Sequence, residues 1–378
     1  GEALPCPRCV FVVGFGKAAA PMAQALEEIL GDRIAGGAVT VKEGHALALD
    51  RVRVTEAGHP IPDERGLAGA REIVRILESL GKDDLALCVV SGGGSALYLV
   101  HDNPPLITGD GYAAAYRAGA SLVNLEMVDF QPLCVSPEKM RGFAPHPTGF
   151  IIMGSIFRNA SGEAFMERYY PGIAEQAGRA EICRAMAMEI REGRGTPAGG
   201  IYLDSTHLPL ERILKYAPHI YRQYKNHGID LTERPQEVAP GSHTWLGGVK
   251  IDVDGAADVP GLFAAGDNAG GIHGANRIGG SALSAAMVFG SRAGKAAARL
   301  AGESAARAKA GQALEGEGVR WLNAVRDRRE GVPAAAVRRE IRELAQADLG
   351  IIREGPRLDA AVERLAALDT RVRESLTL

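Results

Sequence analysis

Three basic or potentially basic side chains stand close to glycines: Arg179, His243 and Arg277. Glycine lets a backbone approach a ligand closely, so glycine-rich segments suit binding sites. A guanidinium binds a carboxylate in bidentate geometry, which fixes both charge and orientation, and a protonated imidazole also donates hydrogen bonds. Residues of these types are the natural clamp for a small molecule that carries carboxylate groups.

A strand, a glycine turn and a helix are predicted near the start of the chain. Val10–Val13 is an apolar run, Gly14-Phe15-Gly16 follows, and apolar residues recur at helical spacing from Met22 to Leu30. Such a turn directs backbone N–H groups and a helix N-terminus toward an anion. The turn is consistent with binding of a dinucleotide pyrophosphate, or with glycines that serve packing alone.

The front of the chain carries three motifs in order. Lys17 lies inside the first turn, Glu56–Asp63 reads Glu-Ala-Gly-His-Pro-Ile-Pro-Asp, and Ser91–Leu97 reads Ser-Gly-Gly-Gly-Ser-Ala-Leu. With these motifs, residues 8–97 resemble the N-terminal domain of the glycerate 2-kinase family. The resemblance implies that Lys17 and the loop Gly92–Ser95 face phosphates or substrate.

From Leu97 onward the motifs are of another kind. The segments are Leu97-Tyr98, Asp102-Asn103-Pro104, Thr108-Gly109-Asp110-Gly111, Ala118-Gly119-Ala120, Pro240–Gly248, Val259–Asp267, Gly274–Leu283 and Leu349–Arg353. They resemble flavoproteins of the fumarate reductase and succinate dehydrogenase family, over residues 97–378. The resemblance implies non-covalently bound FAD and hydride transfer between the flavin and a small dicarboxylate or enoate.

The same resemblance implies which residues hold the cofactor. Asp267 would hold the ribityl chain, and the backbone of Gly280–Leu283 would cap the isoalloxazine, with a helix N-terminus aimed at the flavin. The predicted cofactor-binding residues are Gly14, Gly16, Gly109, Asp110, Gly266, Asp267, Gly280, Ser281 and Leu283.

The resemblance also implies roles for the three basic residues. His243 and Arg277 would each bind a substrate carboxylate, and Arg179 would deliver the proton. A guanidinium, whose pKa is above about 12, can donate only if a relay restores its proton at once. Such a relay needs a nearby carboxylate, and Glu181 is the predicted candidate.

One segment departs from the family. Where the family often has His-Pro-Thr, this chain has Gln131-Pro132-Leu133, and His146-Pro147-Thr148 occurs further along. One carboxylate-binding histidine is therefore replaced. A related enoate is then an alternative substrate to fumarate.

These motifs predict an α/β protein: a Rossmann-like flavin-binding domain with an inserted α+β capping domain and a C-terminal helical region. The predicted domains are 1–97, 98–150 with 237–300, 151–236, and 301–378. Further predicted strands are 51–55, Asp84–Val90, Leu122–Phe130 and Val259–Ala265, and the predicted helices include one with Asp110 as its N-cap, one from Ser281, and those over Val337–Leu344 and Leu358–Leu368.

Composition narrows the class of protein. The net charge is −3 and the pI is about 6.4, which favours neither nucleic acid nor an anionic membrane as partner, and no apolar run reaches membrane-spanning length. Five scattered cysteines argue against a disulfide framework, so a reducing, cytoplasmic location is expected. Cys6 and Cys9 have no second pair, so no metal site is predicted. No iron–sulfur pattern is present, so an electron partner would be a separate protein or soluble carrier.

Each parent family is incomplete in this chain. The usual ADP-binding segment of the flavoproteins is replaced by the kinase-like one, and the second domain of the kinase is missing. Three hypotheses remain open: an FAD-dependent oxidoreductase, a glycerate 2-kinase-like ATP-dependent phosphotransferase, and an inactive hybrid.

Overall fold

The computed structural model describes residues 9–16, 19–58, 63–81, 84–90, 93–103, 105, 107–145, 147–303, 324, 325 and 327–377. The predicted residues Cys6, Lys17, Gly92 and His146 and the segment 59–62 lie outside them. The described residues fall into two compact units. The first lies within 1–94, 104–128 and 244–320, and the second within 95–103, 129–243 and 321–378.

The first unit is built on a parallel four-stranded sheet, in the order β3-β2-β1-β4. The strands are β1 (Val10–Phe15), β2 (Ile34–Lys42), β3 (Arg53–Ala57) and β4 (Leu85–Val90). The strands expected near 10, 51 and 84 are thus confirmed. The chain passes from β1 to β2 and β3 on one side, and then crosses to β4 on the other side of β1. Ligands of open α/β sheets bind at such a switch point, outside the carboxyl ends of the strands.

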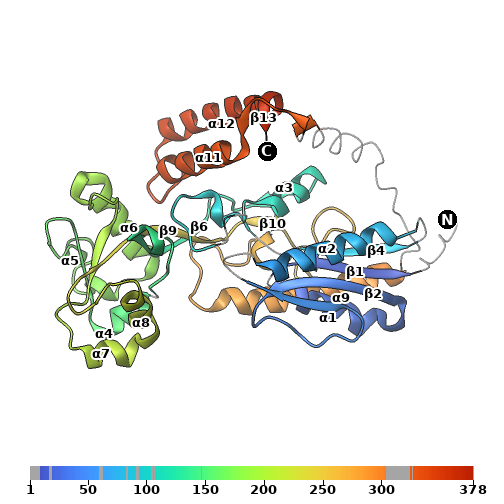
Figure 1. Cartoon of the computed structure of the whole chain (residues 1–378), viewed down its shortest axis with the longest axis horizontal. Helices are drawn as coiled ribbons and strands as arrows, with labels where there is room; N and C mark the ends of the chain where they lie inside the picture. Colours follow the sequence, from blue (N-terminus) through green and yellow to red (C-terminus); the bar gives the residue numbers. More distant parts are fainter. Residues whose placement is uncertain are drawn as a thin grey trace. The chain divides into compact units, whose positions relative to one another are not determined.

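Helices cover both faces of this sheet. As Figure 1 shows, α1 (Ala19–Leu30) and α9 (Ser281–Glu303) lie on one face and α2 (Glu64–Ser79) on the other. The helix expected from Ser281 is confirmed. A Cβ on Gly294 of α9 would lie 2.7 Å from the Met22 carbonyl oxygen of α1. Glycine therefore lets the two helices pack closely.

A smaller sheet and a short helix complete the first unit. The sheet has the order β11-β10-β5 and the helix is α3 (Asp110–Arg117); the strands are β5 (Leu122–Val123), β10 (Gly248–Lys250) and β11 (Ala269–Gly270).

Three predictions are corrected here. Gly109, and not Asp110, is the N-cap of α3, because its φ of 86° suits glycine. The strand expected over 122–130 is interrupted at Asn124, whose φ is +54°. Val259–Ala265 forms no regular strand, only a bridge from Phe263 to Ala256.

The second unit contains a four-stranded sheet in the order β6-β9-β8-β7. Its strands are β6 (Val128–Ser136), β7 (Ile156–Arg158), β8 (Ile201–Asp204) and β9 (Gln236–Trp245), and β8 is antiparallel to both neighbours. Its helices are α4 (Pro147–Met153), α5 (Met166–Tyr169), α6 (Arg179–Glu189), α7 (Leu210–Tyr216) and α8 (Pro218–Asn226). The predicted capping domain, 151–236, lies within this unit.

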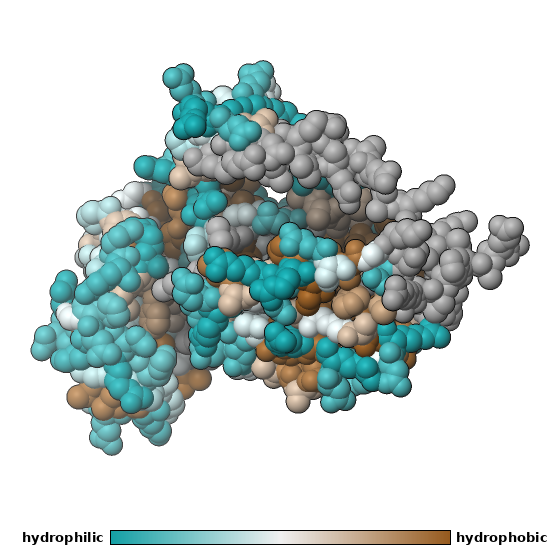
Figure 2. All heavy atoms as spheres, turned by 45° about the vertical axis from the view of Figure 1, so that its right-hand side comes forward, coloured by the Kyte–Doolittle hydropathy of each residue, from teal (hydrophilic) through white to brown (hydrophobic). Residues whose placement is uncertain are grey.

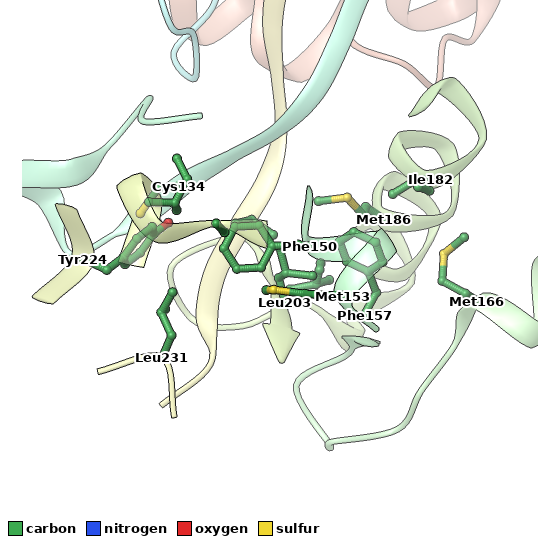
Figure 3. Close-up of a cluster of buried hydrophobic side chains, with 14 of the residues drawn as sticks. Cys134, Phe150, Met153, Phe157, Met166, Ile182, Met186, Leu203, Tyr224 and Leu231 are labelled. Carbon is green, nitrogen blue, oxygen red and sulfur yellow. The ribbon is translucent and has the colours of Figure 1, made fainter. Parts of the chain in front are cut away.

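A buried apolar cluster fixes these helices to the sheet. Phe150 of α4, Phe157 of β7, Met186 of α6, Leu203 of β8 and Tyr224 of α8 are all buried in it. Figure 3 shows these side chains converging on one core. Burying a large apolar side chain contributes roughly 1.5–3 kcal/mol, so this cluster anchors α6, which carries Arg179 at its start.

The C-terminal part of the second unit is helical, as expected. It consists of β12 (Val332–Pro333), α11 (Ala334–Asp348), α12 (Gly355–Ser375) and β13 (Leu376–Thr377). Short 3₁₀ turns occur at Gly31–Arg33, Ser95–Leu97, Glu138–Met140, Ala174–Gln176 and Gly266–Asn268, and a π turn at Ile190–Arg194.

Hydrophilic side chains cover much of the described surface in view in Figure 2, with hydrophobic ones between them. Among the helices of the described residues, none combines the length and the apolar character needed to cross a membrane.

Candidate functional site

His243 lies on β9, where its imidazole meets two polar side chains. Its Nδ1 lies 2.7 Å from Oδ2 of Asp102 and 3.2 Å from Nε2 of Gln131. The Gln131 amide also donates to Asp102 Oδ2, over 2.8 Å. Gln131, the residue at which the chain departs from the family pattern, therefore contacts His243 directly.

Backbone contacts hold Asp102 at this place. The segment before it bridges β9, because Ser242 N donates to Val100 O over 2.9 Å. Asn103 then ties the two segments together, since its Nδ2 donates to His243 O (2.8 Å) and to Asp102 Oδ1 (3.0 Å).

Arg179 is the first residue of α6, and it pairs with a carboxylate from β6. Its Nη2 lies 2.6 Å from Oδ2 of Asp129, whose side chain is 5% exposed. The carboxylate at Arg179 is therefore that of Asp129 and not of Glu181, which was the predicted candidate. Because alternate residues of a strand share a face, Asp129 and Gln131 project from the same face of β6. The predicted residues Arg179 and His243 thus contact side chains that lie two residues apart on β6.

Arg277 belongs to the first unit, in the irregular segment before α9. It is 6% exposed, although the next residue, Ile278, is 80% exposed. Its Nη1 lies 3.5 Å from Ile278 O. The binding of a carboxylate by Arg277 stays a prediction.

The first turn of α3 packs against the turn Gly266–Asn268. The hydroxyl of Tyr112 donates to Asp267 O, and burial together with the nearby Asp267 charge raises the tyrosine pKa, so the hydroxyl stays a neutral donor. A Cβ on Gly111 would lie only 2.1 Å from Asn268 Oδ1, so a side chain at position 111 would require the Asn268 amide to shift. This packing brings together the predicted residues Gly109, Asp110, Gly266 and Asp267.

Gly14 and Gly16 lie at the carboxyl end of β1. A Cβ on Gly14 would stand 1.9 Å from Val89 O of β4, so close strand packing already requires glycine there. Gly16 has a φ of 105°, which favours glycine and turns the chain toward α1. A role of these glycines in binding a pyrophosphate stays a prediction.

The segment before α9 offers open space. A Cβ on Gly279 or Gly280 would meet no other described atom within 4 Å, and Leu283 is 51% exposed. α9 begins at Ser281 and also contacts the turn Gly266–Asn268. A helix N-terminus, backbone N–H groups and the carboxylate of Asp267 form a donor and acceptor set that fits a dinucleotide cofactor.

Two family models match the chain. Residues 65–283, more than half of the chain, match the model of an FAD binding domain. Residues 3–117 match a domain of unknown function, DUF4147. The two matches overlap, which accords with the two resemblances of the sequence.

The chain is similar to several flavoprotein enzymes. It is 41% identical over 281 residues to a subunit of the fumarate reductase (CoM/CoB) of Methanothermobacter marburgensis, over 74% of this chain and 50% of the relative. It is 33% identical over 294 residues to the L-aspartate oxidase of Pseudomonas aeruginosa, over 76% of this chain and 51% of the relative. The chain therefore spans about half the length of the curated relatives it matches.

Solved structures show the same fold. The chain superposes on FrdA of E. coli quinol fumarate reductase with a TM-score of 0.77 at 20% identity, over 100% of this chain and 84% of that one. For Sdh1 of Mycobacterium smegmatis the TM-score is 0.74 at 24% identity, and the superposition covers 98% of this chain and 81% of Sdh1. The likeness thus includes the kinase-like N-terminal segment.

Two polar residues of the site were missed by the sequence analysis: Asp102 and Asp129. A signal for Asp129 was present, because Asp129 and Gln131 alternate with Val128, Phe130 and Pro132 in an otherwise apolar run. Such alternation indicates one polar face on a strand.

Proposed function

Because this chain belongs to the FAD binding domain family, we propose that it is an FAD-dependent oxidoreductase of the fumarate reductase and succinate dehydrogenase type. The observation that carries this proposal is the alignment of two polar groups along one face of β6: the pair Arg179–Asp129 and the group of Asp102, Gln131 and His243. The substrate class is a small dicarboxylate or an enoate.

FAD, when bound non-covalently, supplies or accepts the hydride. The residues proposed to hold it all lie in the first unit, where glycine turns, the N-terminus of α9 and Asp267 offer backbone donors and a carboxylate acceptor. They are Gly14, Gly16, Gly109, Asp110, Gly266, Asp267, Gly280, Ser281 and Leu283.

His243 and Arg277 are proposed to bind substrate carboxylates. A charged donor to a carboxylate contributes about 1.5–3 kcal/mol and fixes the orientation of the bound molecule. Orientation matters because a reacting carbon has to be held in line for transfer. Each residue is assigned this role by itself, because of its side-chain chemistry and because the motif around it resembles the family.

Arg179 is proposed to hold the proton that the substrate carbon receives. After the guanidinium gives up this proton, a second proton has to return to its Nη2. We assign this return to Asp129, whose Oδ2 lies 2.6 Å from Arg179 Nη2 and would pass a proton to that nitrogen. In the opposite direction, Arg179 would take the proton from the carbon and Asp129 would carry it away.

An absorbance spectrum before and after addition of FAD tests the proposal. Bound flavin bands, with FAD released by denaturation, are the expected result for non-covalent binding. Fumarate reduction with a reduced viologen dye as electron donor should then be lost in Arg277→Ala. A colourless chain that takes up no FAD would refute the oxidoreductase.

A cytoplasmic location and a separate electron-transfer partner complete the proposal. Such a partner is tested by co-purification with this protein, and recovery of the protein alone would speak against a stable complex.

The match of residues 3–117 favours a second candidate, a glycerate 2-kinase-like phosphotransferase. This candidate predicts magnesium-dependent ATP binding without flavin colour. Calorimetric titration with Mg-ATP separates it both from the oxidoreductase and from an inactive hybrid, which binds neither ligand.

A further inference from the structure

Asp102 contacts the imidazole of His243 at Nδ1. The distance from Asp102 Oδ2 to His243 Nδ1 is 2.7 Å, and the side chains are 14% and 31% exposed. The partly buried pair leaves Nε2, on the opposite edge of the ring, as the nitrogen that can meet a ligand.

Three donors converge on the Asp102 carboxylate. Gln131 Nε2 donates to Oδ2 and Asn103 Nδ2 donates to Oδ1, over 2.8 and 3.0 Å. The two amide NH₂ groups can only donate, so the carboxylate accepts from both. The third partner, His243 Nδ1, then also has to supply a hydrogen.

This arrangement decides which protons the imidazole carries. A neutral His243 with its hydrogen on Nδ1 presents Nε2 as an acceptor. A substrate carboxylate needs a donor at Nε2, so the ring has to be an imidazolium when it binds such a group. Asp102 supplies a negative charge 2.7 Å from Nδ1 of that cation.

Among the described residues, one charged side chain is hydrogen-bonded to the His243 imidazole. Asp102 faces it from the segment before Asn103, and the neutral Gln131 faces it from β6. Asp129, the ion-pair partner of Arg179, lies two residues before Gln131 on the same strand. His101 bridges to Ser242, and burial lowers its pKa, so it adds little positive charge.

We propose that Asp102 is a positioning residue for His243: it fixes the ring with Nδ1–H toward itself and supports the positive charge that lets Nε2–H bind a substrate carboxylate. This inference rests on the proposed carboxylate-binding function of His243. Gln131 and Asn103 serve by fixing Asp102. None of the three needs to touch the reacting carbon.

The first test reads the ring directly and requires neither flavin nor turnover. Histidines of the full chain are labelled with ¹⁵N, and His243→Gln assigns the signal. In wild-type protein at a pH where the ring is neutral, the hydrogen is expected on Nδ1. Asp102→Asn keeps an acceptor and should keep this tautomer, whereas Asp102→Ala should shift the hydrogen to Nε2. A hydrogen on Nε2 in wild type would overturn the inference.

The second test measures the charge effect by calorimetric titration with fumarate. Asp102→Asn is expected to weaken binding about tenfold, because the imidazolium loses its counter-charge, and in the active enzyme KM should rise with little change in kcat. Asp359→Asn, an exposed carboxylate on α12, is the matched control. Wild-type affinity in Asp102→Asn would overturn the charge role. Absence of fumarate binding by wild type would instead refute the proposed function, while the tautomer still decides the positioning.

Discussion

Asp129 and Gln131 stand two residues apart on β6, so both side chains lie on the same face of the strand. One is the carboxylate partner of Arg179, and the other contacts His243 and Asp102. Two positions along a strand span roughly 7 Å, about the length of a small dicarboxylate. The strand thus sets the spacing between Asp129, which contacts Arg179, and Gln131, which contacts His243.

Asp129→Asn should stop the proton relay while keeping the shape of the site. The amide cannot pass a proton to Arg179 Nη2, so kcat for fumarate reduction is expected to fall about 10²- to 10⁴-fold. Fumarate binding should change little, because Asp129 is not a proposed clamp. Steady-state kinetics with a dye donor measures both quantities. Glu181→Gln, on the same helix as Arg179, is the control and should keep its rate. Equal losses in the two variants would contradict the relay through Asp129.

Glu189, the last residue of α6, should make stability depend on acid pH. Burial alone would raise its pKa, but hydrogen bonds from Arg194, Asn159 and Tyr169 outweigh burial and lower the pKa from 4.5 to about 2. A lowered pKa means that this stabilisation is complete above about pH 4.5 and is lost as the pH falls toward 2. Urea unfolding of wild type from pH 7 to pH 3 should show this loss.

Glu189→Gln removes the charge that Arg168 and Arg194 share. The variant should be less stable by about 1.5–3 kcal/mol at pH 7, because the buried side chain loses its charged hydrogen bonds. Arg168 and Arg194 are then left with Glu163 and Glu192 as ion-pair partners. The difference from wild type should shrink as the pH falls. Glu138→Gln, at an exposed ion pair, serves as control. If the stability difference between Glu189→Gln and wild type did not change with pH, the negative charge of Glu189 would not be its cause.

The parts of the fold that the sequence predicted are those with strong local patterns. The apolar run of β1, the glycine turn after it and the long helix from Ser281 all lie where expected. The break at Asn124 was not foreseen, because a left-handed residue between two apolar runs leaves no periodic signal. The pairing of Asp102 with His243 joins residues far apart in the chain, so it depends on how the segments of the second unit pack.

The flavoprotein family named from the sequence is also confirmed, by the match of residues 65–283 to the FAD binding domain. The partner of Arg179 was assigned wrongly, since Glu181 is its neighbour in sequence and Asp129 its neighbour in space. Arg179 and Asp129 come from different elements, so the local sequence does not show that these two side chains meet.

Gly111→Ala should weaken FAD binding. The added Cβ would stand 2.1 Å from Asn268 Oδ1, so the Asn268 amide has to shift and disturb the packing of α3 against the turn that carries Asp267. We expect at least a tenfold rise in the Kd for FAD, measured by quenching of flavin fluorescence. Gly36→Ala on β2 is the control, because its Cβ would meet only the Phe11 ring at 3.8 Å. Unchanged affinity in Gly111→Ala would place the cofactor away from Asp267.

Gln131→His should shift the substrate preference toward dianions. The glutamine amide is a neutral donor, which contributes about 0.5–1.5 kcal/mol per hydrogen bond, whereas a charged donor contributes about 1.5–3 kcal/mol. An imidazolium at position 131, next to Asp102, should therefore tighten the binding of fumarate about tenfold. The binding of a monocarboxylate such as crotonate should change less, because it has no second carboxylate to use the new charge.

Calorimetric titration of both acids at pH 6 and pH 8 separates charge from shape. The gain for fumarate should be largest at pH 6, where an imidazole with its ordinary pKa near 6.5 is mostly protonated, and should decline at pH 8. Gln131→Leu, which fills the site without a donor, is the control and should lose affinity for both acids alike. A Gln131→His protein whose fumarate affinity is unchanged at both pH values would mean that an imidazolium at position 131 does not reach the bound substrate.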